Sequence, residues 1–179
     1  MTRIARVAAV AITVLTLAAC SEAAPVVTPS PTDAFLVPQG SEASGPIALL
    51  SEGEALDSEW RYGIYPTDDG PCLQLDLDGE VNARCDDLLP EGDAAFGRIG
   101  LVVSETTGAT FVEGVAAESV ATVWLIAEDQ SRVPALLVPL AESGIDAQAF
   151  LGAVTAETRV THVMAVAFNG EVLQTYELP

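Results

Sequence analysis

Short apolar runs separated by turn residues fill the chain from Ile47 onward. Valine, isoleucine, leucine, threonine and aromatic residues recur in these runs, a pattern that predicts β-strands. The segment 47–58 fits either a short helix capped by Ser51 or a further strand. We expect the remaining strands at 60–65, 72–77, 80–85, 97–103, 109–115, 121–127, 132–138, 149–154, 160–168 and 171–178.

Three local signals arrange these strands. Val123-Trp124-Leu125-Ile126 is apolar on both faces, as in a central strand. Pro134 and Pro139 mark the next strand as an edge, because proline cannot donate to a hydrogen-bond ladder. Asn169-Gly170 predicts a tight hairpin turn. The predicted fold class is therefore all-β, an antiparallel β-sandwich or open barrel formed by one domain over residues 47–179.

The stretch from Trp60 to Cys85 contains the most specific local signal. Asp78-Gly79 predicts a two-residue hairpin loop, which sets Leu77 opposite Glu80 and, further along, Cys72 opposite Cys85. Opposed residues are close enough for a disulfide. In this register each face of the hairpin mixes apolar and polar residues. A slip by one residue would gather the apolar side chains on one face but would separate the cysteines, so we retain the disulfide register.

A weak internal repeat supports a layered β architecture. Val115 to Thr122 parallels Val154 to Thr161, with an Ala-Glu-Ser/Thr corner in each. Each unit reads as a strand, a corner, a long apolar strand, a turn and a return strand. Two such units could face each other as the two sheets of a sandwich, although the few identities fit coincidence equally well.

The first nineteen residues predict a signal peptide, outside the fold. Arg3 and Arg6 precede an apolar run that is too short to span a bilayer. The run ends in Leu17-Ala18-Ala19-Cys20, which resembles the lipobox of bacterial lipoproteins. That resemblance implies cleavage before Cys20 and a lipid on its sulfur, with acyl chains such as palmitate that hold the protein at the cell membrane. An ordinary signal peptide with an incidental cysteine is the alternative.

The remaining cysteines then form a pair. With Cys20 lipidated, Cys72 and Cys85 are left for a disulfide in an oxidising, extracytoplasmic compartment. A zinc site is excluded, because two thiolates and the single histidine, His162, do not supply enough ligands.

Residues 20–46 predict a lipidated cysteine followed by a disordered tether. Proline, serine, threonine and glycine dominate it, and such a composition buries too little apolar surface to fold. Ala34-Phe35-Leu36-Val37 is its apolar island, which either docks on the domain or is a local patch. The whole chain resembles the small, tethered, lipid-anchored β-domain proteins that actinobacterial-type bacteria export. That resemblance implies location and architecture, and it carries no assigned activity.

The basic residues exclude several chemistries. All seven are arginine, so a P-loop, a lysine Schiff base and a Ser-x-x-Lys nucleophile are absent from the sequence. A serine-hydrolase triad would have to use His162. His162 lies in a predicted strand, and the Asn169-Gly170 turn places it opposite Glu177. A cross-strand His–Glu pair is the favoured interpretation.

The charge restricts the partners. The formal net charge is −19, and loss of Arg3 and Arg6 with the signal peptide lowers it by two, to −21. Such a field repels nucleic acid, which we exclude as a partner. Gln74-x-Asp76-x-Asp78 fails as a calcium loop because its first and twelfth ligands are missing. The weak metal candidate is a convergence of four carboxylates at the open end of the hairpin: Asp68, Asp69, Asp86 and Asp87.

The aromatic residues before the disulfide form the weak candidate for a binding surface. Trp60, Tyr62 and Tyr65 precede the disulfide, and Trp60, Tyr62 and Ile64 fall on one face of their strand with Arg61 on the other. Exposed, they would stack on a sugar or a partner protein. Core packing is the expectation for Trp60 and also for Trp124.

Three functional hypotheses follow. The favoured one is a non-enzymatic, membrane-anchored extracytoplasmic domain that binds or scaffolds a protein or cell-wall component, without a cofactor. The second is an accessory or sensor subunit of a membrane protein complex, which an apolar patch beside the tether would favour. The third is a hydrolase that uses His162.

Overall fold

The computed structural model describes residues 43–179, and twelve β-strands and one short 3-10 helix form this part of the chain. The strands assemble into three antiparallel sheets of four strands each, which confirms the all-β, sandwich-like fold. The predicted signal peptide, Cys20 and the apolar island at Ala34–Val37 lie outside the described residues. Within residues 43–179, no helix is long and apolar enough to cross a membrane.

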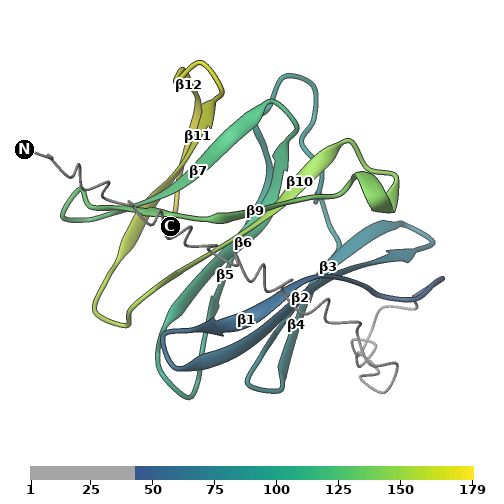
Figure 1. The fold of residues 1–179 in the computed structure, drawn as a ribbon, viewed down its shortest axis with the longest axis horizontal. Coiled ribbons are helices and arrows are strands. Elements are labelled where there is room, and N and C mark those ends of the chain that lie inside the picture. Colours follow the sequence, from purple (N-terminus) through teal and green to yellow (C-terminus); the bar gives the residue numbers. More distant parts are fainter. Residues whose placement is uncertain (1–42) are drawn as a thin grey trace, which may run out of the picture. The chain divides into compact units, whose positions relative to one another are not determined.

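Sheet A is a meander of strands that follow one another in the sequence (Figure 1). It confirms the strand alternative for the segment 47–58. Ala43 forms a β-bridge with Thr67. Strand pairing therefore begins within residues 20–46, which the sequence predicted to be a disordered tether. The four strands are β1 (Ala48–Ala55), β2 (Ser58–Thr67), β3 (Gly70–Leu77) and β4 (Glu80–Arg84).

The register of the β3–β4 hairpin is the predicted one. Leu77 pairs with Glu80 and Leu73 with Arg84. Asp78 and Gly79 form the turn with φ of 52° and 88°, the left-handed conformation that a type I′ turn requires. The Cys72–Cys85 disulfide closes the hairpin with a Cα–Cα distance of 4.2 Å, so the slipped register is excluded.

Sheets B and C share the rest of the chain. Sheet B has the order β5-β6-β10-β9, and sheet C has the order β12-β11-β7-β8. The strands of sheet B are β5 (Phe96–Val103), β6 (Thr110–Ala117), β9 (Leu136–Pro139) and β10 (Ala147–Val154), with the 3-10 helix η1 (Ala141–Ser143) between the last two. The strands of sheet C are β7 (Val120–Ala127), β8 (Arg132–Pro134), β11 (Val160–Ala167) and β12 (Val172–Glu177).

The two repeat units have the predicted internal order but not the predicted arrangement. One unit is β6, a corner, β7, a turn and β8, and the other is β10, a corner, β11, a turn and β12. The units do not face each other as two sheets. Instead β6 pairs with β10 in sheet B and β7 pairs with β11 in sheet C, so each unit contributes strands to both sheets.

The predicted edge strand at 132–138 is two strands in two sheets. β8 lies at the edge of sheet C and β9 at the edge of sheet B. The chain changes sheet at Ala135, whose N–H still donates to Val123 O at 2.9 Å. Pro134 has no N–H to donate, and the ladder of β8 ends there.

Sheet B is the middle layer. Along β6, Phe111 and Val115 belong to a core shared with sheet A, whereas Val112 and Ala116 belong to a core shared with sheet C. Strand alternation sends successive side chains to opposite faces, so an apolar strand with two covered faces is buried along nearly its whole length. The backbone of β6 therefore lies between the two cores and contributes side chains to both.

Candidate functional site

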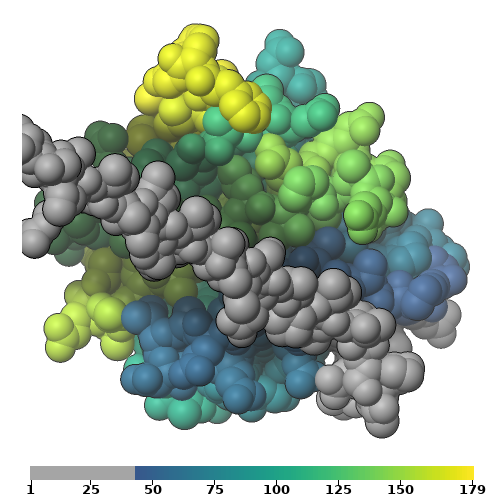
Figure 2. Space-filling model, viewed as in Figure 1, coloured from purple at the N-terminus to yellow at the C-terminus, as the bar shows by residue number. Residues whose placement is uncertain are grey.

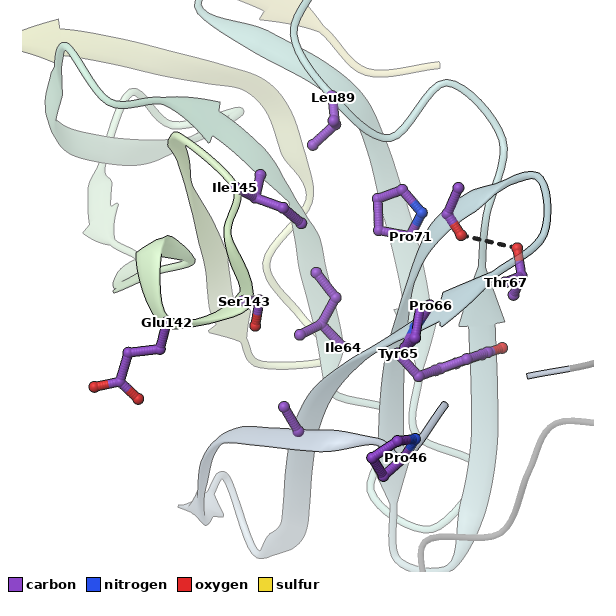
Figure 3. Close-up of a pocket in the computed structure, with 12 residues that line it drawn as sticks. Pro46, Ile64, Tyr65, Pro66, Thr67, Pro71, Leu89, Glu142, Ser143 and Ile145 are labelled. Atoms are coloured by element: carbon purple, nitrogen blue, oxygen red, sulfur yellow. Dashed lines mark hydrogen bonds between the residues drawn. The ribbon is translucent and has the colours of Figure 1, made fainter. Parts of the chain in front are cut away.

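An apolar groove of about 550 Å³ opens at one end of sheet A, beside the point where the chain enters the domain (Figure 3). One side comes from the start of β1, the end of β2 and the start of β3, and the other side comes from the loops before β5 and β10. Its apolar lining includes Ile64, Pro66, Pro71, Leu89 and Ile145.

Proline chemistry shapes the sheet A side of the groove. Pro66 and Pro71 are opposed across the β2–β3 hairpin, where neither ring nitrogen can donate a hydrogen bond. Pro66 O instead accepts from Ser44 N at 2.9 Å, and Thr67 Oγ1 donates to Gly70 O at 2.8 Å. The entering chain and the hairpin end are thereby fixed together, with two proline rings lining the groove.

The opposite side is formed by residues outside regular strands. Leu89 is 37% exposed, a high value for a leucine, and Ile145 is half-buried just before β10. Figure 3 shows both side chains directed toward the space in front of Pro71 and Ile64, and the Glu142 carboxylate lying apart from them. The groove is thus an apolar surface with an acidic residue at its rim, which suits an apolar segment of a partner.

Most of the groove residues were not predicted from the sequence as part of a binding site. Tyr65 is among the lining residues and was a predicted binding candidate, but its side chain is only 1% exposed. Leu88-Leu89-Pro90 offered a usable signal, because two leucines in a segment without a strand pattern are either buried or functional. Leu88 is buried in the core and Leu89 faces the groove.

The other predicted aromatic candidates do not form a surface site. Tyr62 is fully buried in the core between sheets A and B, and Trp60 packs against the same core. The prediction of core packing for Trp124 is wrong. Trp124 alternates with the buried Val123 and Leu125 on β7, so it lies half-buried on the outer face of sheet C.

The four aspartates of the metal candidate do not converge. Among residues 43–179, no three histidine, cysteine, aspartate or glutamate side chains are grouped so as to hold a metal ion. Asp68 and Asp69 are exposed in the β2–β3 turn. Asp86 instead lies 3.8 Å from Arg98, an exposed ion pair.

His162 and Glu177 are cross-strand partners, as predicted. The His162 Nδ1 lies 2.9 Å from Thr161 Oγ1, whose hydroxyl also donates to Ile126 O at 3.2 Å. The Thr161 hydroxyl is thus shared between the ring and the backbone. The hydrolase hypothesis stays a prediction of the sequence.

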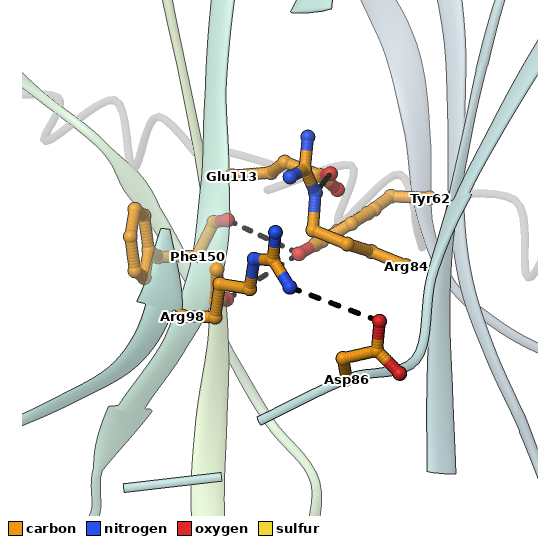
Figure 4. A network of polar contacts seen from close by, with 7 residues as sticks. Tyr62, Arg84, Asp86, Arg98, Glu113 and Phe150 are labelled. Atoms are coloured by element: carbon orange, nitrogen blue, oxygen red, sulfur yellow. Dashed lines mark hydrogen bonds and ion pairs between the residues drawn. The ribbon is translucent and has the colours of Figure 1, made fainter. Parts of the chain in front are cut away.

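A polar cluster lies between sheets A and B (Figure 4). Arg84 Nε donates to Glu113 Oε1 at 3.1 Å, with the Glu113 side chain 2% exposed. Burial raises the pKa of Glu113, and the nearby Arg84 only partly offsets this. The Tyr62 hydroxyl lies 3.3 Å from Phe150 O, and burial raises its pKa well above the usual range.

Glycine makes room for this cluster. A Cβ on Gly100 would clash with the Arg84 guanidinium, so in this arrangement the guanidinium crosses β5 where the glycine leaves room for it. A second polar set joins the same two sheets, because Ser58 Oγ donates to Ser104 Oγ at 3.1 Å and Ser104 Oγ donates to Asp78 Oδ2 at 3.4 Å. Both sets connect sheet A with β5, β6 or the loop after β5, and we expect them to fix how sheets A and B are aligned.

The β11–β12 hairpin of sheet C carries the most exposed large apolar side chain of residues 43–179. Phe168, in the β11–β12 turn, is 84% exposed, and Val172 on β12 is 52% exposed. This hairpin is yellow at the surface in Figure 2. The exposed apolar residues of this hairpin lie on one element and form no groove, whereas the groove beside sheet A is bounded on two sides.

Comparison with protein-family models, with curated proteins and with solved structures found no match.

Proposed function

We propose that this chain is an exported bacterial lipoprotein, anchored to the membrane through Cys20, whose β-domain is a non-enzymatic binding module. The single observation that carries the binding proposal is the groove beside the entry point of the tether. Its apolar lining and acidic rim fit an apolar segment of a partner protein better than a nucleic acid or an anionic surface. The lipobox-like Leu17–Cys20 supports the anchor.

A lipid-modification experiment tests the anchor. The Cys20→Ala chain should accumulate as a soluble form or an uncleaved precursor without acyl chains, while the parent chain partitions into the membrane. Mass spectrometry of the N-terminal peptide is the measurement. Acyl chains on the Cys20→Ala protein would disprove the lipobox interpretation.

Photocrosslinking in intact membranes tests the binding module. A photoreactive residue at Leu89, in the groove, should give one discrete adduct with another protein. The same residue at Leu136, on the edge of sheet B, is the matched control, since the two leucines are 37% and 42% exposed. Leu89→Asp should abolish binding of the captured protein, and Leu136→Asp should retain it. Equal adducts from both positions, or none from Leu89, would refute the proposal.

The position of the groove also favours an accessory subunit of a membrane protein complex. A groove next to Ala43 is held near the membrane by the tether, within reach of membrane-embedded neighbours. In that case the Leu89 adduct is an integral membrane protein, and the adduct is lost when Cys20→Ala releases the chain. An adduct that survives release identifies a soluble or cell-wall partner.

A further inference from the structure

The edge strand β12 of sheet C presents an apolar surface for strand pairing. Among residues 43–179, β12 pairs with β11 on one side and with no strand on the other. Its sequence, Val-Leu-Gln-Thr-Tyr-Glu, contains no proline, and its single charge is Glu177 at the last position. Val172, Leu173 and Tyr176 are 52%, 40% and 39% exposed. An exposed apolar edge strand of this kind is a template for pairing with another chain.

The other five edge strands of residues 43–179 each have features that hinder such pairing. β1 carries Glu52 and Glu54 together with a bulge, and β4 is a short strand that begins with Glu80. β5 has a bulge, and its Arg98 N–H donates to Asp87 O in the adjoining loop at 2.9 Å. β8 and β9 are short and end in proline. Charges, bulges, proline and short length are the common protection of sheet edges, so β12 is the least protected edge of the domain.

The hydrogen bonds of β12 show which of its backbone groups face the free edge. Leu178 N donates to Thr161 O at 2.8 Å, so the backbone of Leu178 points toward β11. Hydrogen-bonded and non-hydrogen-bonded pairs alternate along an antiparallel ladder. Tyr176 therefore also bonds to β11, whereas Thr175 and Glu177 point their N–H and C=O groups outward. The bulge of β12 lies at its turn end, so this alternation is regular over the second half of the strand.

We propose that β12 pairs antiparallel with β12 of a second copy of this chain, about a two-fold axis at Thr175. In this register the outward backbone groups of the two Thr175 residues bond to each other, and Glu177 of each copy lies opposite Leu173 of the other. Threonine pairs are favourable across strands, and no two glutamates are opposed. The neighbouring register, with Leu173 opposite Thr175, would set Glu171 opposite Glu177, a destabilising like-charge pair.

The charge of the chain favours a second copy over an unrelated peptide. A peptide attracted to a chain of net charge −19 would be basic, but the centre of β12 has no carboxylate to bind it. The same uncharged centre lets two acidic copies approach each other there. Tyr176 shares a face with Val163 of the B–C core and lies at the open margin of that core. The pairing sets each Tyr176 ring beside Gln174 of the other copy, which covers it.

The opposite edge of sheet C limits the assembly to two copies. β8 has three residues and ends in Pro134, which has no N–H for a further strand. Two sheets joined through β12 therefore form one closed, eight-stranded sheet with a blocked edge on each side, and not a filament. β12 contributes no lining residue to the groove, so the dimer and the proposed binding module are tested separately.

Cysteine crosslinking of the full-length chain in intact cells tests the register. The two Thr175 Cα atoms should lie about 5.5 Å apart, within disulfide range, so Thr175→Cys should give a homodimer on oxidation with copper–phenanthroline. Val103→Cys is the matched control and should stay monomeric, since Val103 is exposed on a different edge strand, β5. Equal homodimer yields at the two positions, no homodimer from Thr175→Cys, or an adduct with another protein instead would overturn the proposal.

A proline variant tests the backbone pairing. Added to Thr175→Cys, Glu177→Pro should lower the homodimer yield by roughly tenfold, because each copy loses an outward N–H. Glu177→Val is the matched control, since it also removes the carboxylate but keeps the N–H, and it should retain the yield. Hydrogen exchange of β11 verifies that sheet C stays folded, as the Glu177 N–H does not bond to β11. Equal yields from the two variants would contradict pairing through β12.

Discussion

The two faces of sheet B are covered in different ways. Toward sheet C, a cluster of buried apolar side chains fills the interface, with the Phe96 and Phe150 rings 5.6 Å apart at their centroids, and charged groups are absent from this cluster. Toward sheet A, the apolar contacts surround Glu113 and its ion pair with Arg84. β6 supplies both faces, since Glu113 lies between Val112 and Gly114 along the strand.

The difference shows how a layered β-protein fixes the alignment of its sheets. Apolar contacts are largely non-directional and scale with buried area, so they stabilise a layer without defining its position sharply. A buried ion pair contributes little net stability but is costly to break. We expect the B–C interface to supply most of the stability and the A–B interface to set the position of sheet A.

The largest effect is expected from Phe150→Ala in the B–C interface. Removal of this fully buried ring should lower the free energy of unfolding by about 3–5 kcal/mol in urea titrations. Phe168→Ala is the control, because Phe168 is 84% exposed and should change stability by less than about 0.5 kcal/mol. A similar loss from both would show that the B–C core does not carry the stability.

Arg84→Met should be next, with a loss of roughly 2 kcal/mol. Glu113 would stay buried without its cation, although the cost is reduced because the Arg84 side chain is 29% exposed. The double variant Arg84→Met with Glu113→Leu should recover much of that loss. Arg98→Met is the control, since its exposed ion pair with Asp86 contributes little. No recovery in the double variant would argue against a pairwise role.

The pH dependence of stability sharpens the comparison further. The pKa of Glu113 is raised in the folded state, so the folded protein binds more protons than the unfolded chain between the two pKa values. This contribution to stability is full below the unfolded pKa and is lost as pH rises through the folded pKa. Relative to Glu113→Gln, the parent protein should therefore lose stability as pH rises above about 4.5. A constant difference between the two proteins across acidic and neutral pH would contradict the raised pKa.

The smallest effect is expected in the β3–β4 turn. Gly79 has a φ of 88°, and Gly79→Val should cost about 1–2 kcal/mol because a β-branched residue is strained there. Asp78→Asn should be nearly neutral, since asparagine tolerates the left-handed region. Thermal unfolding of the two variants checks the difference, and equal midpoints would show that the turn does not define the hairpin.

Local chemistry explains which parts of the fold were predictable. Asp78-Gly79 and the cysteines act over a short stretch, so the sequence predicted their register. The mixed faces of that hairpin, an apparent objection, reflect partners that lie far away in the sequence. Arg84 on the inner face meets Glu113, which is 29 residues away, and no local pattern records that contact.

The groove and the layer order were not predictable for a related reason. The groove combines segments near residues 46, 66, 89 and 145, and each one reads as an ordinary turn or loop by itself. The third layer depends on the chain changing sheets at Ala135 and at the two corners. Trp124 illustrates the limit, because an apolar strand predicts burial but not which face is covered.

The strand order of the layers determines the sequence of events in folding. Sheet A pairs strands that are neighbours in the sequence. The β6–β10 pairing in sheet B instead joins distant segments, as Thr110 opposite Val154 shows, and it forms only after β10 is available. Closing the longer loops costs more entropy, and distant pairings form slowly. In a chain synthesised from its N-terminus, sheet A emerges before the layer that covers its leucines exists. The nascent domain therefore passes through an interval in which one formed sheet exposes an apolar face, the moment at which it is most open to aggregation.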